Sequence, residues 1–293
     1  MGESDRLLTI LTREVGLVRA VAMGSRKHNS SLGGRSGLFV VNELLIAKGR
    51  SLDKLTQAET IESYPGLSQD LRKLTAAQYL AELALYQALS DQPQDELFLL
   101  LNESLKQIEQ APAAMILPCL TQAMFQLLIL AGVVPQVHAC CVTRQVILPD
   151  LTDPNWRVGF SPVAGGVVTL EALAQISQEH SKPRSEGLAA VEARVQAGGA
   201  ARPVASPDRD RIRPPAPQTT QFLTATELAL LQQLEKIDLH ASDPVLNGDD
   251  PVYVAEVWRS LESLLRHYAE YHLDRQIRSA SLIDACFLPA HSP

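Results

Sequence analysis

The stretch "RLLTILTREVGLVRAVAMG", residues 6–24, indicates how the chain begins to fold. Two short runs compatible with β-structure flank "REVG", and such runs separated by a turn are typical of paired strands. A further apolar run, "GLFVVNELLIAKG" (residues 37–49), is bounded by glycine, and "SSLGGRSG" (residues 30–37) is a Gly/Ser loop. Several short strands within about 65 residues predict a small antiparallel barrel or sandwich.

The period of the apolar residues changes from Gln69 onward. In "QDLRKLTAAQYLAELALYQAL" (residues 69–89) apolar side chains recur near one helical face, and "DELFLLLNESLKQIEQ" (residues 95–110) continues as helix. Near the C-terminus "VYVAEVWRSLESLLRHYAEYHL" (residues 252–273) carries another helical apolar stripe. The sequence therefore predicts an α+β protein with a β-rich N-terminal part and an all-α remainder.

The composition suggests where the domains begin and end. We expect a β domain over residues 1–66, a helical domain over 67–180, and closing helices over 221–293. Between the last two lies a Pro/Ala-rich segment, residues 181–220, that contains "GGAARPVASPDRDRIRPPAPQ". It cannot bury enough apolar area to offset its chain entropy, so it is predicted to be a disordered insertion.

Overall composition favours a soluble protein of the cytoplasm. The 293 residues carry a formal net charge of -7 and four cysteines, which suggests a reducing compartment rather than a disulfide framework. "AAMILPCLTQAMFQLLILAGVV" (residues 113–134) is long enough to span a bilayer, but Pro118 and Gln122 interrupt it and no basic cluster flanks it. We therefore expect a buried central helix and no membrane partner.

Basic residues are concentrated in the N-terminal part. Between Arg19 and Lys54 seven lysines and arginines face only two acids, whereas acids dominate from Glu59 to Glu109. Cations around a flexible loop can neutralise phosphates and release counterions without reading sequence. The alternative is an ordinary solvated surface. The candidate DNA-binding residues are Arg19, Arg26, Lys27, Arg35, Lys48 and Arg50. Only Phe39 and Tyr64 could stack on bases here, so binding should be mainly electrostatic and steeply salt-sensitive.

Five segments in order resemble the bacterial RecO family of recombination mediators. They are "GESDRLLTILTREVGLVRAVAMGSRKHNSSLGG" (residues 2–34), "AKGRSLDKLTQAE" (47–59), "YLAELALYQALSDQPQDELFLLL" (79–101), "GFSPVAGGVV" (159–168) and "YAEYHLDRQIRSASLI" (268–283). The resemblance covers nearly the whole chain apart from the Pro/Ala-rich segment. It implies an N-terminal OB-fold, a C-terminal helical domain and no catalysis.

The resemblance also implies a function and its partners. Family members bind single- and double-stranded DNA, anneal complementary strands, and with RecR help to load RecA onto DNA coated by single-stranded-DNA-binding protein. The C-terminal tail of that coating protein is a further implied partner, and Arg275 and Arg278 are candidates for binding it. Compensation of a helix dipole is the alternative explanation for these two arginines. A nucleoid-associated location follows from the same resemblance.

Two hypotheses of another class stay open. One is a scaffold of the same pathway that binds partners but has weak or no DNA affinity, which the acidic net charge of -7 favours. The other is a hydrolase that uses Cys140 as nucleophile with His138 as base. No Walker loop or dinucleotide fingerprint occurs in the sequence, and nothing near Cys140 supplies an orienting acid.

The chain departs from the family at its beginning. In the family, residues equivalent to "GESDRLL" (residues 2–8) follow an opening strand of the barrel, and no such strand precedes them here. An unpaired barrel edge is an aggregation liability. We therefore expect either a barrel that lacks its first strand or a start codon assigned downstream of the true one.

A second departure concerns the cysteines of "HACCVTRQV", residues 138–146. The family often carries a zinc site made by two CxxC pairs, and alignment places Cys140, Thr143, Thr169 and Ala172 at the four ligand positions. Because three of the four ligands are missing, zinc binding is not expected. Residues 135–172 are predicted to be a degenerate zinc-ribbon-like segment in which Cys140 is a vestigial ligand position. A disulfide between adjacent cysteines would be strained.

Overall fold

The computed structural model describes residues 2–181, 220–235 and 251–287. The chain divides into two compact units. One comprises Met1–Pro135 with Thr226–Pro293, and the other comprises Gln136–Ala225. The predicted disordered insertion lies outside the described residues, apart from its two end residues.

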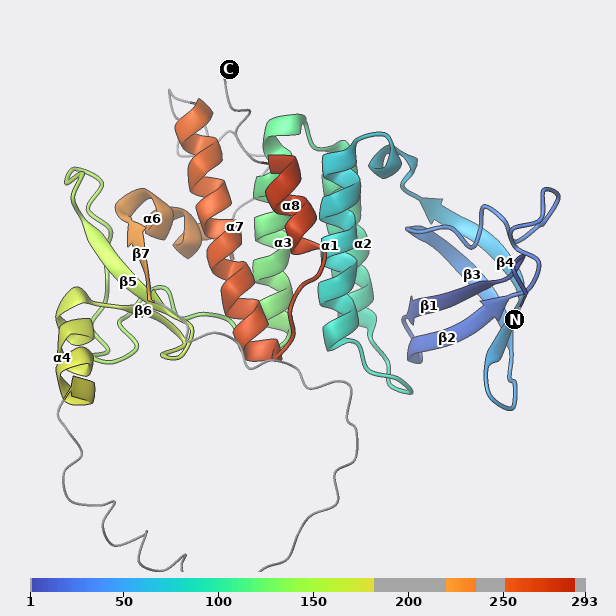
Figure 1. Ribbon diagram of the computed structural model, residues 1–293, viewed down its shortest axis with the longest axis horizontal. Helices are drawn as coiled ribbons and strands as arrows, with labels where there is room; N and C mark the ends of the chain where they lie inside the picture. The colour runs from blue at the N-terminus through green and yellow to red at the C-terminus, as the bar shows by residue number, and fades with distance from the viewer. Residues whose placement is uncertain (1, 182–219, 236–250, 288–293) are drawn as a thin grey trace, which may run out of the picture. The chain divides into compact units, whose positions relative to one another are not determined.

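The first unit begins with a four-stranded sheet that we call the N-terminal sheet (Figure 1). Its strands are β1 (Arg6–Thr12), β2 (Gly16–Ala22), β3 (Val40–Ala47) and β4 (Asp53–Ser63), in the order β1-β2-β4-β3. β1 pairs antiparallel with β2, β3 pairs antiparallel with β4, and β2 and β4 are parallel. A small core of Ala22, Leu32, Leu55 and Ala58 supports it.

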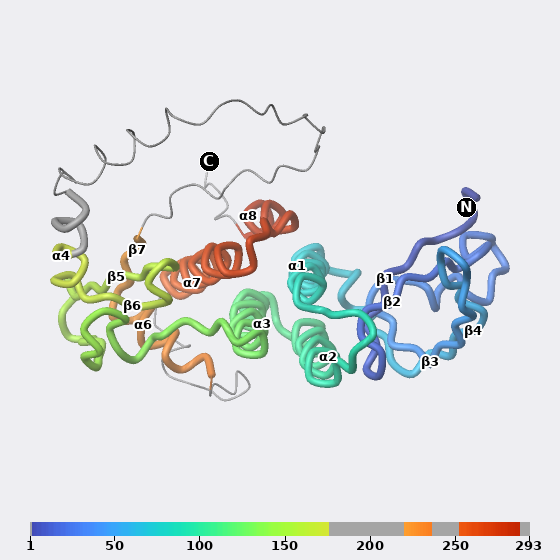
Figure 2. The backbone as a smooth tube through the Cα atoms, turned by 90° about the horizontal axis from the view of Figure 1, so that it is seen from below, coloured from blue at the N-terminus to red at the C-terminus, as the bar shows by residue number. Residues whose placement is uncertain are grey.

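The other elements described in the first unit are helices, which confirms the predicted α+β class. Their bounds are η1 (Pro65–Ser68), α1 (Leu71–Gln87), α2 (Asp95–Gln110), η2 (Ala113–Met115), α3 (Ile116–Leu130), α6 (Ala225–Gln233), α7 (Pro251–Leu273) and α8 (Ala280–Phe287). Asp70 begins α1 by accepting a hydrogen bond from the Arg72 backbone N–H at 2.8 Å. In Figure 2 α1, α2 and α3 lie side by side and are seen nearly end-on.

The uncharged helix α3 lies at the centre of this bundle. It packs against α1, α2 and α7. By length and composition the window Ala113–Leu130 could cross a membrane, and 61% of it is buried inside the protein. Its neighbours cover the apolar surface, which is the pattern of a core helix.

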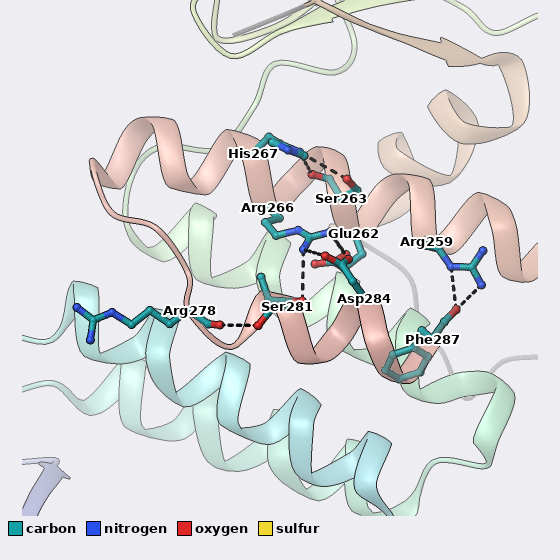
Figure 3. A network of polar contacts seen from close by, with 10 residues as sticks. Arg259, Glu262, Ser263, Arg266, His267, Arg278, Ser281, Asp284 and Phe287 are labelled. Carbon is teal, nitrogen blue, oxygen red and sulfur yellow. Dashed lines mark hydrogen bonds and ion pairs between the residues drawn. The ribbon is translucent and has the colours of Figure 1, made fainter. Parts of the chain in front are cut away.

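A polar network joins α7 to α8 within the bundle (Figure 3). Arg266 donates to both carboxylate oxygens of Asp284, at 2.9 and 2.8 Å, and lies 3.3 Å from a carboxylate oxygen of Glu262. Glu262 is fully buried, and this burial raises the pKa of its carboxyl to about 7 although Arg266 opposes the shift. Arg259 donates to the backbone carbonyl of Phe287, so α8 is tied to α7 both near its middle and at its C-terminal end.

The second unit is built on a three-stranded antiparallel sheet with the order β6-β5-β7. Its elements are β5 (Arg157–Ser161), β6 (Gly166–Val168), α4 (Leu170–Ser181) and β7 (Gln221–Thr224). A Cβ at Gly159 would lie 2.2 Å from the Leu173 side chain, so this glycine allows α4 to approach β5. Sequence reasoning assigned residues from 221 onward to the closing helices. The structure differs, because Gln221–Thr224 pair with β5 as a strand.

Candidate nucleic-acid interface

The six cations predicted to bind DNA are all exposed, and they form two groups on the N-terminal sheet. One group lies in the segment between β2 and β3, residues 23–39, which we call the cation loop. The other lies at the β3–β4 turn, residues 48–52, because the pairing of Ala20 with Asp53 places Arg19 beside that turn. The loop group is Arg26, Lys27 and Arg35, and the turn group is Arg19, Lys48 and Arg50.

The cation loop is tied to the start of β1 by backbone contacts. The Gly24 N–H donates to the Asp5 carboxylate at 2.8 Å, and the Arg26 N–H donates to the Ser4 carbonyl at 2.9 Å. The hydrogen bond from Gly24 is the main reason that the pKa of Asp5 is lowered. Leu32 packs into the small core beneath the sheet. The loop that carries three of the cations therefore has a defined structure.

Arg6 provides a further contact to the loop, which sequence reasoning missed. Its guanidinium donates to the Gly33 carbonyl at 2.8 Å and to the Ser36 hydroxyl at 3.1 Å. Arg6 is half-buried, and Ser36 is buried. Gly33 and Ser36 follow Arg6 by 27 and 30 positions in the sequence, so no local pattern could reveal these contacts.

The cations at the β3–β4 turn are not equivalent. The Lys48 ammonium lies 2.9 Å from the Asp53 carboxylate, which also accepts a hydrogen bond from the Gly49 N–H at 3.1 Å. The hydrogen bond between Lys48 and Asp53 is the main reason that the pKa of Lys48 is raised and that of Asp53 is lowered. Within the described residues, the side chains of Arg19 and Arg50 make neither an ion pair nor a hydrogen bond. These two are more available to phosphate than Lys48.

One further cation belongs with the turn group although it was not among the six. Lys54 is exposed on β4, directly opposite Ala47 at the end of β3. Its place in the basic stretch between Arg19 and Lys54 was a usable sequence signal. The strand register decides that it lies beside the turn, because Val21 of β2 is its partner on the other side.

The opposite end of the β3–β4 hairpin is acidic. Glu43 and Glu59 are directly paired across the strands, and Glu62 follows near the end of β4. All three are exposed, and Glu62 lies 3.8 Å from the Lys106 ammonium. The hairpin therefore carries cations at its turn and carboxylates from its middle toward its base. A phosphate backbone is attracted by the first and repelled by the second.

The two aromatic residues of this region differ in their accessibility. Tyr64 is only 5% exposed, so its ring is not available to stack on a base. Phe39 is half-buried and ends the cation loop in a left-handed backbone conformation, with φ at 58°. A single partly exposed ring leaves the cations as the main feature that a nucleic acid could contact.

In the second unit, the four aligned ligand positions lie in one hydrogen-bonded cluster. The Cys140 sulfur accepts from the backbone N–H groups of Thr143 and Thr169, both at 3.4 Å, and lies 3.9 Å from the Thr169 hydroxyl. That hydroxyl in turn accepts from the Ala172 N–H at 3.4 Å. Burial disfavours the Cys140 thiolate, but these donors outweigh it and lower its pKa to about 7.

The donors around Cys140 do not suit zinc. Two threonines and an alanine replace the thiolates that a tetrahedral structural site needs. Within residues 2–181, 220–235 and 251–287, no three His, Cys, Asp or Glu side chains come together to hold a metal ion. Cys140 is fully buried and Cys141 is half-buried, whereas His138 is exposed. Hydrogen bonds to the Cys140 sulfur join the segment around Thr143 to the segment around Thr169.

Arg275 and Arg278 lie in the turn between α7 and α8. We expected them on the last helix near its C-terminal end, but α7 ends at Leu273 and Asp274 follows with φ at 50°. The Arg275 guanidinium lies 5.9 Å from the centre of the Tyr86 ring. The backbone N–H of Arg278 donates to Glu82 on α1 at 2.9 Å. Both side chains are exposed beside α1.

Comparisons with known proteins match both parts of the chain. Residues 1–64 match the family model "Recombination protein O N terminal", and residues 68–193 match "Recombination protein O C terminal". The chain belongs to the RecO family. The boundary between the two RecO matches falls where β4 gives way to η1, so the N-terminal match contains the N-terminal sheet, the cation loop and the turn group.

Relatives within the RecO family cover almost the whole chain. Each of three proteins named "DNA repair protein RecO" is about half identical to it. The one from Nostoc sp. is 50% identical over 295 residues, which is 99% of this chain and 93% of the relative. The one from Acaryochloris marina is 51% identical over 288 residues (98% and 91%), and the one from Cyanothece sp. is 52% identical over 292 residues (99% and 92%).

Proposed function

We propose that this RecO-family chain acts in DNA repair and homologous recombination as a mediator that binds DNA and is not an enzyme. Its curated relatives carry the name of a DNA repair protein. The observation that supports DNA binding is the pair of exposed cation groups on the N-terminal sheet. We also propose that this sheet is an OB-fold-like barrel. The chain would work on DNA at the nucleoid, in the cytoplasm.

Single- and double-stranded DNA would both bind through their phosphates. The loop group and the turn group offer charge without base-reading geometry, so affinity should depend on salt rather than on sequence. Neutralising two backbones lowers their mutual repulsion and leaves the base edges free to pair. This chemistry favours annealing of complementary strands.

The proposed partners are RecR, with which the chain would help to load RecA, and the acidic C-terminal tail of single-stranded-DNA-binding protein. Arg275 and Arg278 present two exposed cations beside α1, next to the Tyr86 ring. A cation beside an aromatic ring is chemistry that suits an acidic and apolar tail. The hydrogen bonds from Arg278 and Ser279 to Glu82 keep this turn in place.

We also propose that the Cys140 cluster is what remains of a zinc ribbon. Its four positions still meet, and hydrogen bonds to sulfur and to a threonine hydroxyl take the place of metal coordination. The segment then has a structural role and no part in chemistry.

A partner-binding scaffold with little DNA affinity is the second candidate. The acidic end of the β3–β4 hairpin and the net charge of -7 favour it, because both repel phosphate. The two candidates differ in whether the chain itself must hold DNA.

Annealing of complementary strands coated with single-stranded-DNA-binding protein separates them. In one variant Arg26, Lys27 and Arg35 all become glutamine. In a matched control Arg13, Arg72 and Lys106 become glutamine, which removes the same charge from ion pairs elsewhere in the first unit. We expect the loop variant to lose annealing and the control to retain it. Equal annealing by both variants would remove the loop from the DNA-binding surface.

A further inference from the structure

The cation loop poses an energetic problem for DNA binding. Residues 23–39 form neither a strand nor a helix, and ordering each residue of such a segment costs conformational entropy. If the loop became ordered only on binding, this entropy loss would reduce the affinity that the loop cations supply. A loop that is ordered in the free protein avoids this loss.

The structure contains contacts that order the loop before any ligand is present. The beginning of the loop is held by Asp5 and Ser4, through Gly24 and Arg26 respectively. The middle is held by Leu32 in the core. The remaining part, where Arg35 lies, is held by the guanidinium of Arg6, which bonds Gly33 and Ser36 on either side of Arg35.

The contacts of Arg6 distinguish it from the loop cations. Two of its hydrogen bonds go to a backbone carbonyl and to the hydroxyl of a buried serine. Arg6 is half-buried, whereas the Arg35 side chain is exposed and, among the described residues, donates a single long hydrogen bond of 3.4 Å to the Ser31 carbonyl. The Arg35 backbone carbonyl accepts a hydrogen bond from Asn42 at 2.9 Å. A guanidinium holds its donors in a rigid planar fork, so it can fix two acceptors of one loop together.

We propose that Arg6 is a positioning residue that fixes the cation loop in its DNA-binding conformation and does not itself contact phosphate. This inference rests on the proposed function, because it assigns a role toward DNA. It separates two kinds of arginine in one surface. Arg35 contributes charge to the phosphate, and Arg6 contributes order to the loop.

The dependence of affinity on salt tells these roles apart. The full chain is titrated with a fluorescent oligothymidylate at several salt concentrations. Arg6→Met should weaken binding about tenfold, since charged hydrogen bonds that order the loop are lost. The slope of log affinity against log salt should stay unchanged, because the same cations reach phosphate once the loop is bound. Arg35→Gln should lower that slope by about 0.7, the value for one phosphate contact on a single strand.

Two variants and one further measurement complete the test. Arg13→Met removes an exposed arginine of the same hairpin that is paired with Asp95, and should leave affinity unchanged within about twofold. Ser36→Ala deletes one acceptor without the risk of unfolding the sheet, and should weaken binding about threefold. Amide hydrogen exchange of residues 24–38 should accelerate in both Arg6→Met and Ser36→Ala.

Each alternative result overturns a specific statement. If Arg6→Met lowers the salt slope as Arg35→Gln does, Arg6 is a phosphate contact and the positioning role is wrong. If Arg6→Met and Ser36→Ala both bind like Arg13→Met, the loop needs no positioning residue. If the triple glutamine variant of Arg26, Lys27 and Arg35 binds DNA as the unmodified chain does, the proposed DNA-binding surface fails, and the role of Arg6 fails with it.

Discussion

Glu43 lies directly opposite Glu59 in the antiparallel pair of β3 and β4. Both side chains are exposed and point to the same face of the sheet, because directly opposed residues share a face. Two like charges in this arrangement oppose each other, and both repel a nucleic acid that approaches the hairpin. The pair therefore opposes the pairing of β3 with β4 and makes this part of the hairpin unfavourable for a phosphate.

Glu59→Gln should relieve this repulsion. We expect the free energy of unfolding to rise by about 0.2–1 kcal/mol and DNA affinity to rise at low salt. Urea unfolding at low and high salt measures the first effect, which should shrink as salt screens the pair. Thr56→Ser, on the same strand, is the uncharged control. A stability gain that persists at high salt would contradict an electrostatic cause.

Glu262 should make stability depend on pH. Its folded-state pKa of about 7 lies above the ordinary value of 4.5, because burial disfavours its charge. The folded protein then holds more protons than the unfolded chain between these values, so this contribution to stability is complete below about pH 4.5 and is lost as pH rises through 7. Relative to the unmodified chain, Glu262→Gln should gain up to roughly 3 kcal/mol between pH 4.5 and 8.

Urea unfolding across that pH range measures the Glu262 effect. The difference between the two proteins isolates Glu262 from other titrating groups. The lowered pKa of Asp284 acts outside this range, because its stabilising effect is lost only as the pH falls below about 4. Glu96→Gln, which removes an exposed carboxylate at the start of α2, is the control for the loss of one carboxylate from the chain. A constant difference between Glu262→Gln and the unmodified chain would show that Glu262 is charged throughout.

Gly16 should not tolerate a side chain. It has φ at 69°, and an added Cβ would lie 2.1 Å from the Leu89 carbonyl oxygen and 2.6 Å from that of Gln92. Gly132 has nearly the same φ, 71°, and nothing within 4 Å of such a Cβ. Gly132→Ala should therefore lose only the conformational term of about 1–2 kcal/mol. Gly16→Ala should lose clearly more in thermal unfolding, and equal losses would mean that the segment around Leu89 moves aside.

Arg50 should contribute more to DNA binding than Lys48. Lys48 is already paired with Asp53 at 2.9 Å, so a phosphate must compete with that carboxylate. We expect Arg50→Gln to weaken binding about threefold and to lower the salt slope, and Lys48→Gln to weaken it less than about twofold. The titration with oligothymidylate provides the measurement. A larger loss for Lys48→Gln would mean that Asp53 releases the lysine when DNA binds.

Much of the secondary structure followed from local patterns. The runs on either side of "REVG" became β1 and β2, and the helical spacing after Gln69 became α1 and α2. These patterns can be read along the chain because a strand repeats every two residues and a helix every 3.6. The short strand β7 was not predicted, because four residues carry too little pattern and its partner β5 lies more than 50 positions earlier in the sequence.

In the candidate interface, too, some features could be predicted from the sequence and others could not. Its charge was visible in the sequence, because the number and spacing of lysines and arginines are properties of the chain itself. Only the tertiary structure decided that Tyr64 is buried, that Glu43 meets Glu59, and that Arg6 reaches Gly33. Each of these depends on strand register and on packing between residues distant in sequence, and local preferences carry no information about which distant partner a side chain meets.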